Sequence, residues 1–213
     1  MAIGRVVRRE LLDDLPPHDP EAQRSRRDLR VINALMGNFA WISRQLRAFS
    51  SQTSGGVAEI GAGEGLLCRH LRSAFPDVAL TGLDLAPRPD GLSSCIAWDQ
   101  DDIFASLPRT QASALTGVMI AHHFSEEALS TLAPLLDRFR LICLCEPWRT
   151  PWSLALSSTM MPFVGAVTKH DMPASIEAGF RPGELARFLN LQGWEIRESV
   201  DFRGSLRLVA WRK

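Results

Sequence analysis

The sequence predicts an α/β fold, with a mostly parallel seven-stranded sheet, an antiparallel last strand and helices on both faces. Between residues 57 and 145, short apolar runs alternate with longer helical segments, which is typical of βαβ units. Two further apolar runs, 194–200 and 206–211, are joined around Gly204 and predict a terminal hairpin. A chain of 213 residues is long enough for one such domain.

The segment before residue 55 is expected to be helical. Apolar residues recur there at spacings of three and four, first over 29–36 and again over 41–49. The predicted organisation is therefore an N-terminal helical cap over 1–54, followed by the α/β core over 55–213.

The core elements follow from apolar runs and their boundaries. The parallel strands are expected at 57–60, 78–83, 94–98, 115–121 and 141–145, and the helices at 66–75, 126–139 and 183–191. Residues 147–180 show no clean period and are interpreted as an insertion in the core.

Composition narrows the functional classes. Lys plus Arg and Asp plus Glu both count 24, so the net charge is about zero. This argues against a protein that binds nucleic acid through bulk positive charge, and against a polybasic membrane anchor. No apolar run approaches the ~18 residues of a membrane span, and the first ten residues do not resemble a signal peptide. The four cysteines do not form a zinc-ligand pattern. We therefore expect a cytoplasmic protein without stable membrane insertion, nucleic acid or metal.

The strongest local motif is a glycine loop after the first strand. Gly61, Gly63 and Gly65 are spaced G-x-G-x-G, and the acid Glu59 stands just before them. Glycines let the backbone turn sharply and approach a ligand closely. Dinucleotide sites use the spacing G-x-G-x-x-G instead. A carboxylate at this point suits a ligand with an amino-acid moiety and a sulfonium better than a pyrophosphate.

Acidic residues end the next two strands. Asp84 lies about 20 residues after the loop, where a carboxylate can accept both ribose hydroxyls of an adenosine. Its alternative role is a turn cap before Pro87. Asp99, Asp101 and Asp102 follow the third strand, and either one of them meets an adenine amine or they form a solvated acidic turn.

The segment from Glu59 to Gly65 resembles motif I of class I S-adenosylmethionine (SAM)-dependent methyltransferases, which have a Rossmann-like fold. The resemblance covers about 55–213 and includes the antiparallel last strand. It implies SAM as the cofactor. It also implies the following contacts: Glu59, Gly61, Ala62, Gly63, Gly65, Asp84, Leu85, Asp102, Ile103 and Ala121.

A narrower likeness points to small bacterial methyltransferases associated with polyketide or phenolic-lipid pathways. It rests on four stretches: Ala121-His122-His123-Phe124, Glu146-Pro147-Trp148-Arg149, Thr168-Lys169-His170-Asp171 and Ser175-Ile176-Glu177-Ala178-Gly179-Phe180. The helix that contains Asp28, Leu29, Arg30 and Asn33 is also similar to that group's leading helix. This likeness implies O-methylation of a small aromatic or polyketide-like molecule.

The acceptor site is expected beyond the carboxyl ends of the fourth and fifth strands. We hypothesise that His123 or His170 is a general base for a phenol or enol, oriented by Asp171 or Glu146. In the alternative, His122 or His123 packs as a hydrogen-bonded structural residue.

The insertion is expected to cover the acceptor. Trp148, Arg149, Met161 and Phe163 are its candidate substrate-binding residues, although an ordinary packed helix would suit the apolar ones nearly as well.

Other activities stay open from the sequence. These are C-methylation or carboxyl methylation of a small molecule, non-catalytic SAM binding, and a nicotinamide-dependent oxidoreductase, which the glycine spacing and Glu59 disfavour. An amphipathic N-terminal helix is compatible with a homodimer.

Overall fold

A computed structural model describes residues 3–212 and contains one seven-stranded sheet in the order β3-β2-β1-β4-β5-β7-β6. The strands are β1 (Val57–Ile60), β2 (Leu80–Asp84), β3 (Ile96–Gln100), β4 (Ala114–Val118), β5 (Leu141–Pro147), β6 (Glu195–Val200) and β7 (Ser205–Trp211). The first five pair in parallel, and β7 runs antiparallel to both β5 and β6. The predicted fold class is confirmed, with the hairpin inserted so that its second strand meets β5.

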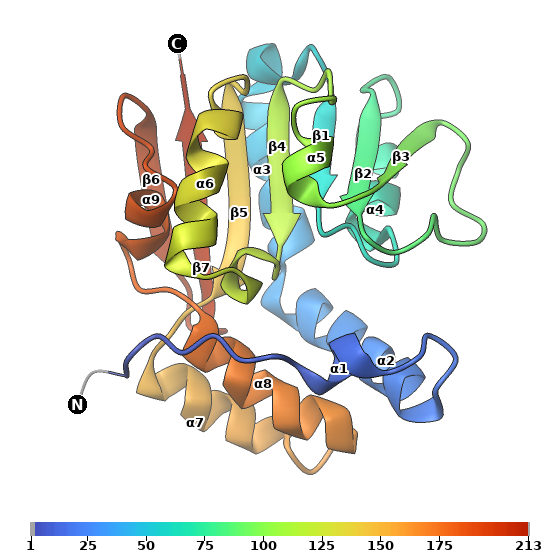
Figure 1. Cartoon of the computed structure of the whole chain (residues 1–213), viewed down its shortest axis with the longest axis vertical. Coiled ribbons are helices and arrows are strands. Elements are labelled where there is room, and N and C mark those ends of the chain that lie inside the picture. Colours follow the sequence, from blue (N-terminus) through green and yellow to red (C-terminus); the bar gives the residue numbers. More distant parts are fainter. Residues whose placement is uncertain (1–2, 213) are drawn as a thin grey trace.

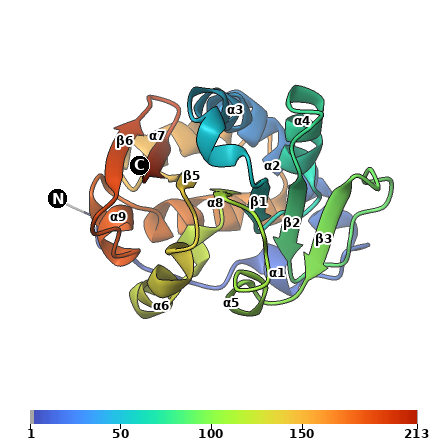
Figure 2. The same ribbon diagram turned by 90° about the horizontal axis from the view of Figure 1, so that it is seen from above.

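Helices cover both faces of this sheet, as Figure 2 shows from above. The first face carries α3 (Asn38–Ala48) and α4 (Leu66–Ala74), and the second carries α5 (Ile103–Ser106), α6 (Glu126–Leu136) and α9 (Glu184–Phe188). Strand β5 is buried on both sides. Cys143 and Cys145 pack in the cluster with α3 and α4, whereas Ile142 and Leu144 pack in the cluster with α6. This alternation follows from the two-residue period of a strand.

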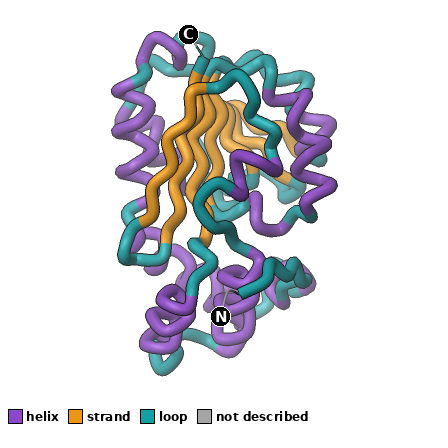
Figure 3. Tube along the Cα trace, turned by 90° about the vertical axis from the view of Figure 1, so that its left-hand side faces the viewer, coloured by secondary structure: helices purple, strands orange, loops and turns teal. Residues whose placement is uncertain are grey.

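A separate layer of helices lies beyond the carboxyl ends of the parallel strands (Figures 1 and 3). This cap layer consists of α1 (Leu11–Asp14), α2 (Pro20–Met36), α7 (Pro151–Met160) and α8 (Ala166–Ala178). It joins the N-terminal helices to residues 151–178, because α8 packs against α1, α2 and α7. The 3-10 turn η2 (Ala121–His123) after β4 also contacts α8.

Residues 147–180, whose sequence has no clean hydrophobic period, contain the two helices α7 and α8. Helix α8 has neighbours on several sides, including β5 and three helices of the cap layer. Apolar residues are consequently spread around the helix and do not form the single stripe that identifies a surface helix. Pro173 lies inside α8 and weakens the helical signal further.

The N-terminal segment of residues 3–14, called the strap below, is tied across the cap layer. Arg5 donates to the carbonyl oxygens of Ala178 and Phe124. Its guanidinium carbon also lies 4.7 Å from the centre of the Phe180 ring. At the other end of the strap, the backbone N–H groups of Leu11 and Leu12 donate to the Asp171 carboxylate. The strap thereby forms a fixed wall beside η2 and α8.

Within residues 3–212, none of the helices is both long and apolar enough to cross a membrane.

Candidate functional site

The glycine loop leaves β1 in a conformation that favours glycine. Gly61, Gly63 and Gly65 have φ angles of 62°, 50° and 67°, in the left-handed region where other residues are strained. A Cβ on Gly61 would lie 2.5 Å from Cγ1 of Ile120. Beside it, Ala62 is buried. The loop therefore needs glycine for its backbone angles and, at Gly61, for space.

Asp84 is held at the edge of this loop. Its Oδ2 accepts from the Gly63 N–H at 2.7 Å, and its Oδ1 accepts from the Ala86 N–H at 2.7 Å. Each carboxylate oxygen can accept a further hydrogen bond. The next residue, Leu85, is 71% exposed. The structure thus places an oriented carboxylate beside an uncovered apolar side chain, a combination that suits a ribose and its base.

Glu59 is the most unusual group in this half of the site. The residue is 4% exposed, and its Oε2 is buried with no hydrogen-bond partner in the described part of the chain. Burial raises the pKa of Glu59 to about 8. A buried polar atom without a partner costs free energy, so Glu59 is suited to a cationic or donor group of a ligand.

The acids after β3 have different surroundings. Asp102 caps α5 by accepting from the Phe104 N–H at 2.8 Å, and Ile103 is buried in the core. Asp99 and Asp101 both pair with Arg109 at 2.9 Å, so these two form an exposed ion-paired turn.

The second half of the site lies after β4. Glu146, at the end of β5, is fully buried. It accepts from the backbone N–H groups of Ile120, Ala121 and His122. The Nδ1 of His122 also lies 2.9 Å from Oε2 of Glu146. The Glu146 carboxylate therefore fixes both the backbone of η2 and the ring of His122.

His122 is a charged residue in this environment. Its Nε2 lies 3.5 Å from Oε1 of Glu10 in the strap. Burial alone would lower the pKa of His122, but the two carboxylates outweigh it and raise that pKa to about 9. Both ring nitrogens consequently carry protons at neutral pH, and His122 cannot accept another.

His123 has the opposite character. Its ring centre lies 4.3 Å from that of His122, and its Nδ1 lies 3.7 Å from Oδ2 of Asp13. Burial, together with the charge on His122, lowers the pKa of His123. This ring is therefore neutral near pH 7 and can accept a proton.

The other predicted catalytic pair lies on α8. His170 is largely exposed, and its Nδ1 lies 2.9 Å from Oδ1 of Asp171. The same Asp171 carboxylate holds the first turn of α1, so it secures the strap as well as contacting His170.

Glu10 and Asp13 did not emerge as site residues from the sequence. They lie among the alternating charges of the N-terminal segment, and nothing local distinguishes them from solvated surface acids. Side-chain atoms of Glu10, His122 and His123 lie within 4.8 Å of one another. Because His122 is a protonated donor between two carboxylates, this group is an ion-paired hydrogen-bond network.

The candidate substrate residues lie in distinct environments. Trp148 is partly buried against the apolar core, and its backbone forms an isolated parallel β-bridge with Phe180. Arg149 is 3% exposed and pairs with both carboxylate oxygens of Glu184 at 2.7 and 2.8 Å. Met161 is partly exposed at the end of α7, and Phe163 is 80% exposed. The Arg149 guanidinium thus forms its hydrogen bonds within the protein, with Glu184 and the Gly179 carbonyl.

Comparison with known proteins supports the fold. No family model and no curated protein match the sequence. Among solved structures, the plantazolicin methyltransferase BamL, in complex with a triazolic desmethyl-plantazolicin analogue and S-adenosylhomocysteine (SAH), is similar with a TM-score of 0.73 and 11% identity. That match covers 95% of this chain and 93% of BamL. Human N-acetylserotonin methyltransferase with SAM has a TM-score of 0.58 and 15% identity, over 96% of this chain and 63% of the human one.

A methyltransferase from Nostoc punctiforme, described as a putative O-methyltransferase, has a TM-score of 0.64 and 13% identity. The match covers 98% of this chain and 64% of that one. At these identities the shared property is the fold, which is the Rossmann-like fold of class I methyltransferases.

Proposed function

We propose that this protein is a SAM-dependent methyltransferase that methylates a hydroxyl group of a small aromatic or polyketide-like molecule. The observation that carries the proposal is that two acids, Glu59 and Asp84, lie next to a glycine loop whose glycines have left-handed backbone angles. One acid is buried with an unpartnered oxygen, and the other is held by backbone N–H groups at the loop edge. These two acids suit an adenosine with an amino-acid tail, which offers ribose hydroxyls and an ammonium group as donors.

The residues present fit this cofactor. In the proposal Asp84 accepts from the ribose hydroxyls, Glu59 faces the ammonium group, and Asp102 accepts from the adenine amine with its remaining lone pairs. Leu85 supplies an apolar surface for the adenosine. The remaining contacts are assigned to Gly61, Ala62, Gly63, Gly65, Ile103 and Ala121.

SAM, when bound, supplies a methyl carbon that the acceptor oxygen attacks as the carbon–sulfur bond breaks, leaving SAH. The protein must align that oxygen, exclude water and remove its proton. We assign His123 as the general base, because its pKa is lowered and the ring is neutral near pH 7. His122 is protonated and is assigned to position η2 and the strap.

The acceptor is proposed to lie between η2 and the cap layer. Trp148, Met161 and Phe163 are retained as candidate contacts for an apolar molecule, together with His170 on α8. Asp171 is assigned to orient His170, whose Nδ1 lies 2.9 Å from Oδ1 of Asp171. Arg149 is left out of this set, since its guanidinium pairs with Glu184 and donates to the Gly179 carbonyl.

The proposal is tested first by calorimetric titration of SAM and SAH into the wild type, Asp84→Ala and Asp137→Ala. Micromolar binding is expected for the wild type, and Asp84→Ala should weaken it by roughly 1–3 kcal/mol, the contribution of a charged hydrogen bond. Asp137→Ala is the matched control, because Asp137 is an exposed acid at the end of α6 that pairs with Arg212. A wild type that binds neither ligand would overturn the proposal.

The acceptor class is tested by transfer of a labelled methyl group from SAM to a panel of phenols, quinols, hydroxypyrones and carboxylic acids. Labelled aryl ethers are the expected products. Labelled esters would indicate carboxyl methylation, and label on carbon would indicate C-methylation. Cofactor binding without transfer to any member would favour a non-catalytic SAM-binding role.

A further inference from the structure

Arg30 connects the cap layer to the glycine loop. It lies on α2, and its Nη1 is 2.9 and 2.8 Å from the two carboxylate oxygens of Glu64, inside the loop. The Arg30 and Glu64 side chains are 41% and 39% exposed. Exposed ion pairs contribute little to stability, so the fold does not depend on this contact.

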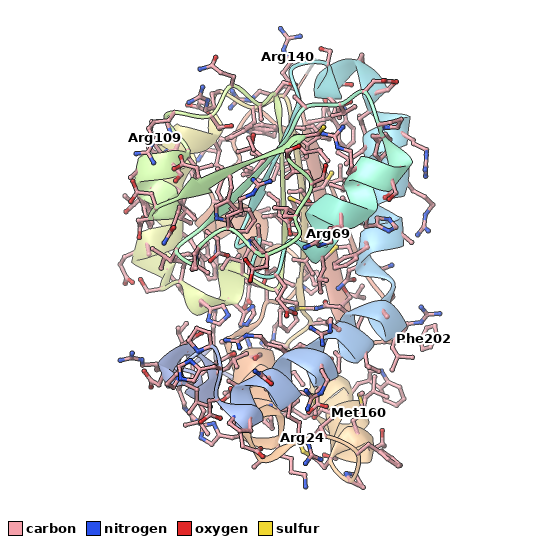
Figure 4. All side chains as sticks on the ribbon, turned by 90° about the vertical axis from the view of Figure 1, so that its right-hand side faces the viewer. Arg24, Arg69, Arg109, Arg140, Met160 and Phe202 are labelled. Carbon is pink, nitrogen blue, oxygen red and sulfur yellow. The ribbon has the colours of Figure 1, made fainter. Side chains whose placement is uncertain are left out.

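The amino-acid end of SAM carries a carboxylate as well as an ammonium group. Glu59 suits the ammonium, and the carboxylate needs a cation close to the same loop. Two arginines on α4, the helix that follows the loop, already donate hydrogen bonds to backbone carbonyl groups of the protein. Arg69, labelled in Figure 4, donates to the carbonyls of Asp90 and Gly91, and Arg72 donates to those of Pro76 and Cys95.

Arg30 differs from these two, because its partner is a solvent-exposed carboxylate and not backbone carbonyl groups. A ligand carboxylate can replace such a partner without breaking an internal contact of the fold. The planar guanidinium also matches a carboxylate with two parallel hydrogen bonds.

A second polar group lies on the same side of α2. Asn33 is three residues after Arg30, and residues at this spacing are neighbours on a helix surface. Its Oδ1 is buried and has no hydrogen-bond partner within residues 3–212. This side of α2 therefore carries a cationic donor, Arg30, and a polar atom for which the described residues supply no partner.

We propose that Arg30 binds the carboxylate of the donor's amino-acid end in place of Glu64. The inference rests on the proposed function and names a cofactor contact supplied by the cap. Glu64 holds Arg30 over the loop and competes with the ligand carboxylate for it. Through this exchange, the α2 helix distinguishes a donor with its amino-acid tail from a bare nucleoside.

The test compares two ligands that differ in that tail. SAH and 5′-methylthioadenosine, which lacks the amino-acid end, are titrated calorimetrically into the wild type, Arg30→Gln and Glu64→Gln. Arg30→Gln should weaken SAH binding on the order of tenfold to a hundredfold and leave methylthioadenosine binding unchanged. Glu64→Gln should bind SAH at least as tightly as the wild type, because the competing anion is removed.

Arg44→Gln is the matched control, since Arg44 is exposed on α3 and forms no ion pair within the described residues. Its affinities for both ligands should equal those of the wild type. Equal losses for both ligands in Arg30→Gln, or no loss for SAH, would overturn the carboxylate contact alone. A wild type that binds neither ligand would overturn the proposed function and this contact with it.

Discussion

Oε1 of Glu10 lies 3.5 Å from Nε2 of His122, and this ion pair joins the N-terminal strap to the turn after β4. Glu146 holds the other nitrogen of the same ring at 2.9 Å. His122 is thus a protonated connector between a strand end and the strap, which leaves the neighbouring His123 neutral. The two adjacent histidines, alike in sequence, have different protonation states because their partners differ.

The first prediction concerns His123. His123→Gln should lower kcat by on the order of a hundredfold or more, the usual contribution of a general base, while the dissociation constant for SAM stays at the wild-type value. Rates at saturating SAM and calorimetric affinities check this. His18→Gln, at an exposed residue between α1 and α2, is the control. Wild-type turnover by His123→Gln would refute the base assignment, and a loss in His170→Gln instead would move it to α8.

The second prediction concerns stability and pH. The pKa of His122 is raised from its usual 6.5 to about 9 in the folded protein. The ion pairs therefore contribute stability that is fully present below about pH 6.5 and is lost as pH rises through about 9. The difference in Tm between wild type and His122→Gln should be largest near pH 6, shrink as the pH rises towards 9, and be small above it. Thermal unfolding between pH 6 and 10 measures it, and a difference independent of pH would contradict the protonated state.

The third prediction concerns proton release. Glu59 has a pKa raised to about 8 by burial, so it is mostly protonated in the free protein at pH 7. An ammonium group beside it would lower that pKa, and SAH binding should release up to about one proton at pH 7. Calorimetry in buffers of different ionisation enthalpy detects this release. It should disappear in Glu59→Gln and decline above pH 8, and its absence in the wild type would place the ammonium elsewhere.

The fourth prediction concerns the contribution of Arg149 to stability. This guanidinium is buried and pairs with Glu184. Arg149→Met should lower the free energy of unfolding by about 3 kcal/mol, because it leaves a partly buried carboxylate without its partner. Urea denaturation measures the loss. Arg109→Met removes an exposed arginine that also pairs with two acids, and should change stability far less. Similar losses in both variants would count against burial as the cause.

Local patterns were enough to predict the fold class. The alternation of apolar runs and helices, the loop containing Gly61 and the acid Asp84 all lie within short stretches, and their geometry depends mainly on backbone chemistry. The helices within residues 147–180 could not be predicted from the sequence, because α8 packs on several sides and lacks a single apolar stripe.

The sequence by itself determined the sheet, the glycine loop and the acids Glu59 and Asp84, because backbone conformation and strand periodicity are local properties. Only the tertiary structure decided that Glu10 and Asp13 meet His122 and His123, that Asp171 holds the strap, and that Arg30 reaches Glu64. These contacts join distant segments, and the protonation of each histidine depends on burial and on charges brought together by folding. No pattern along the chain contains that information.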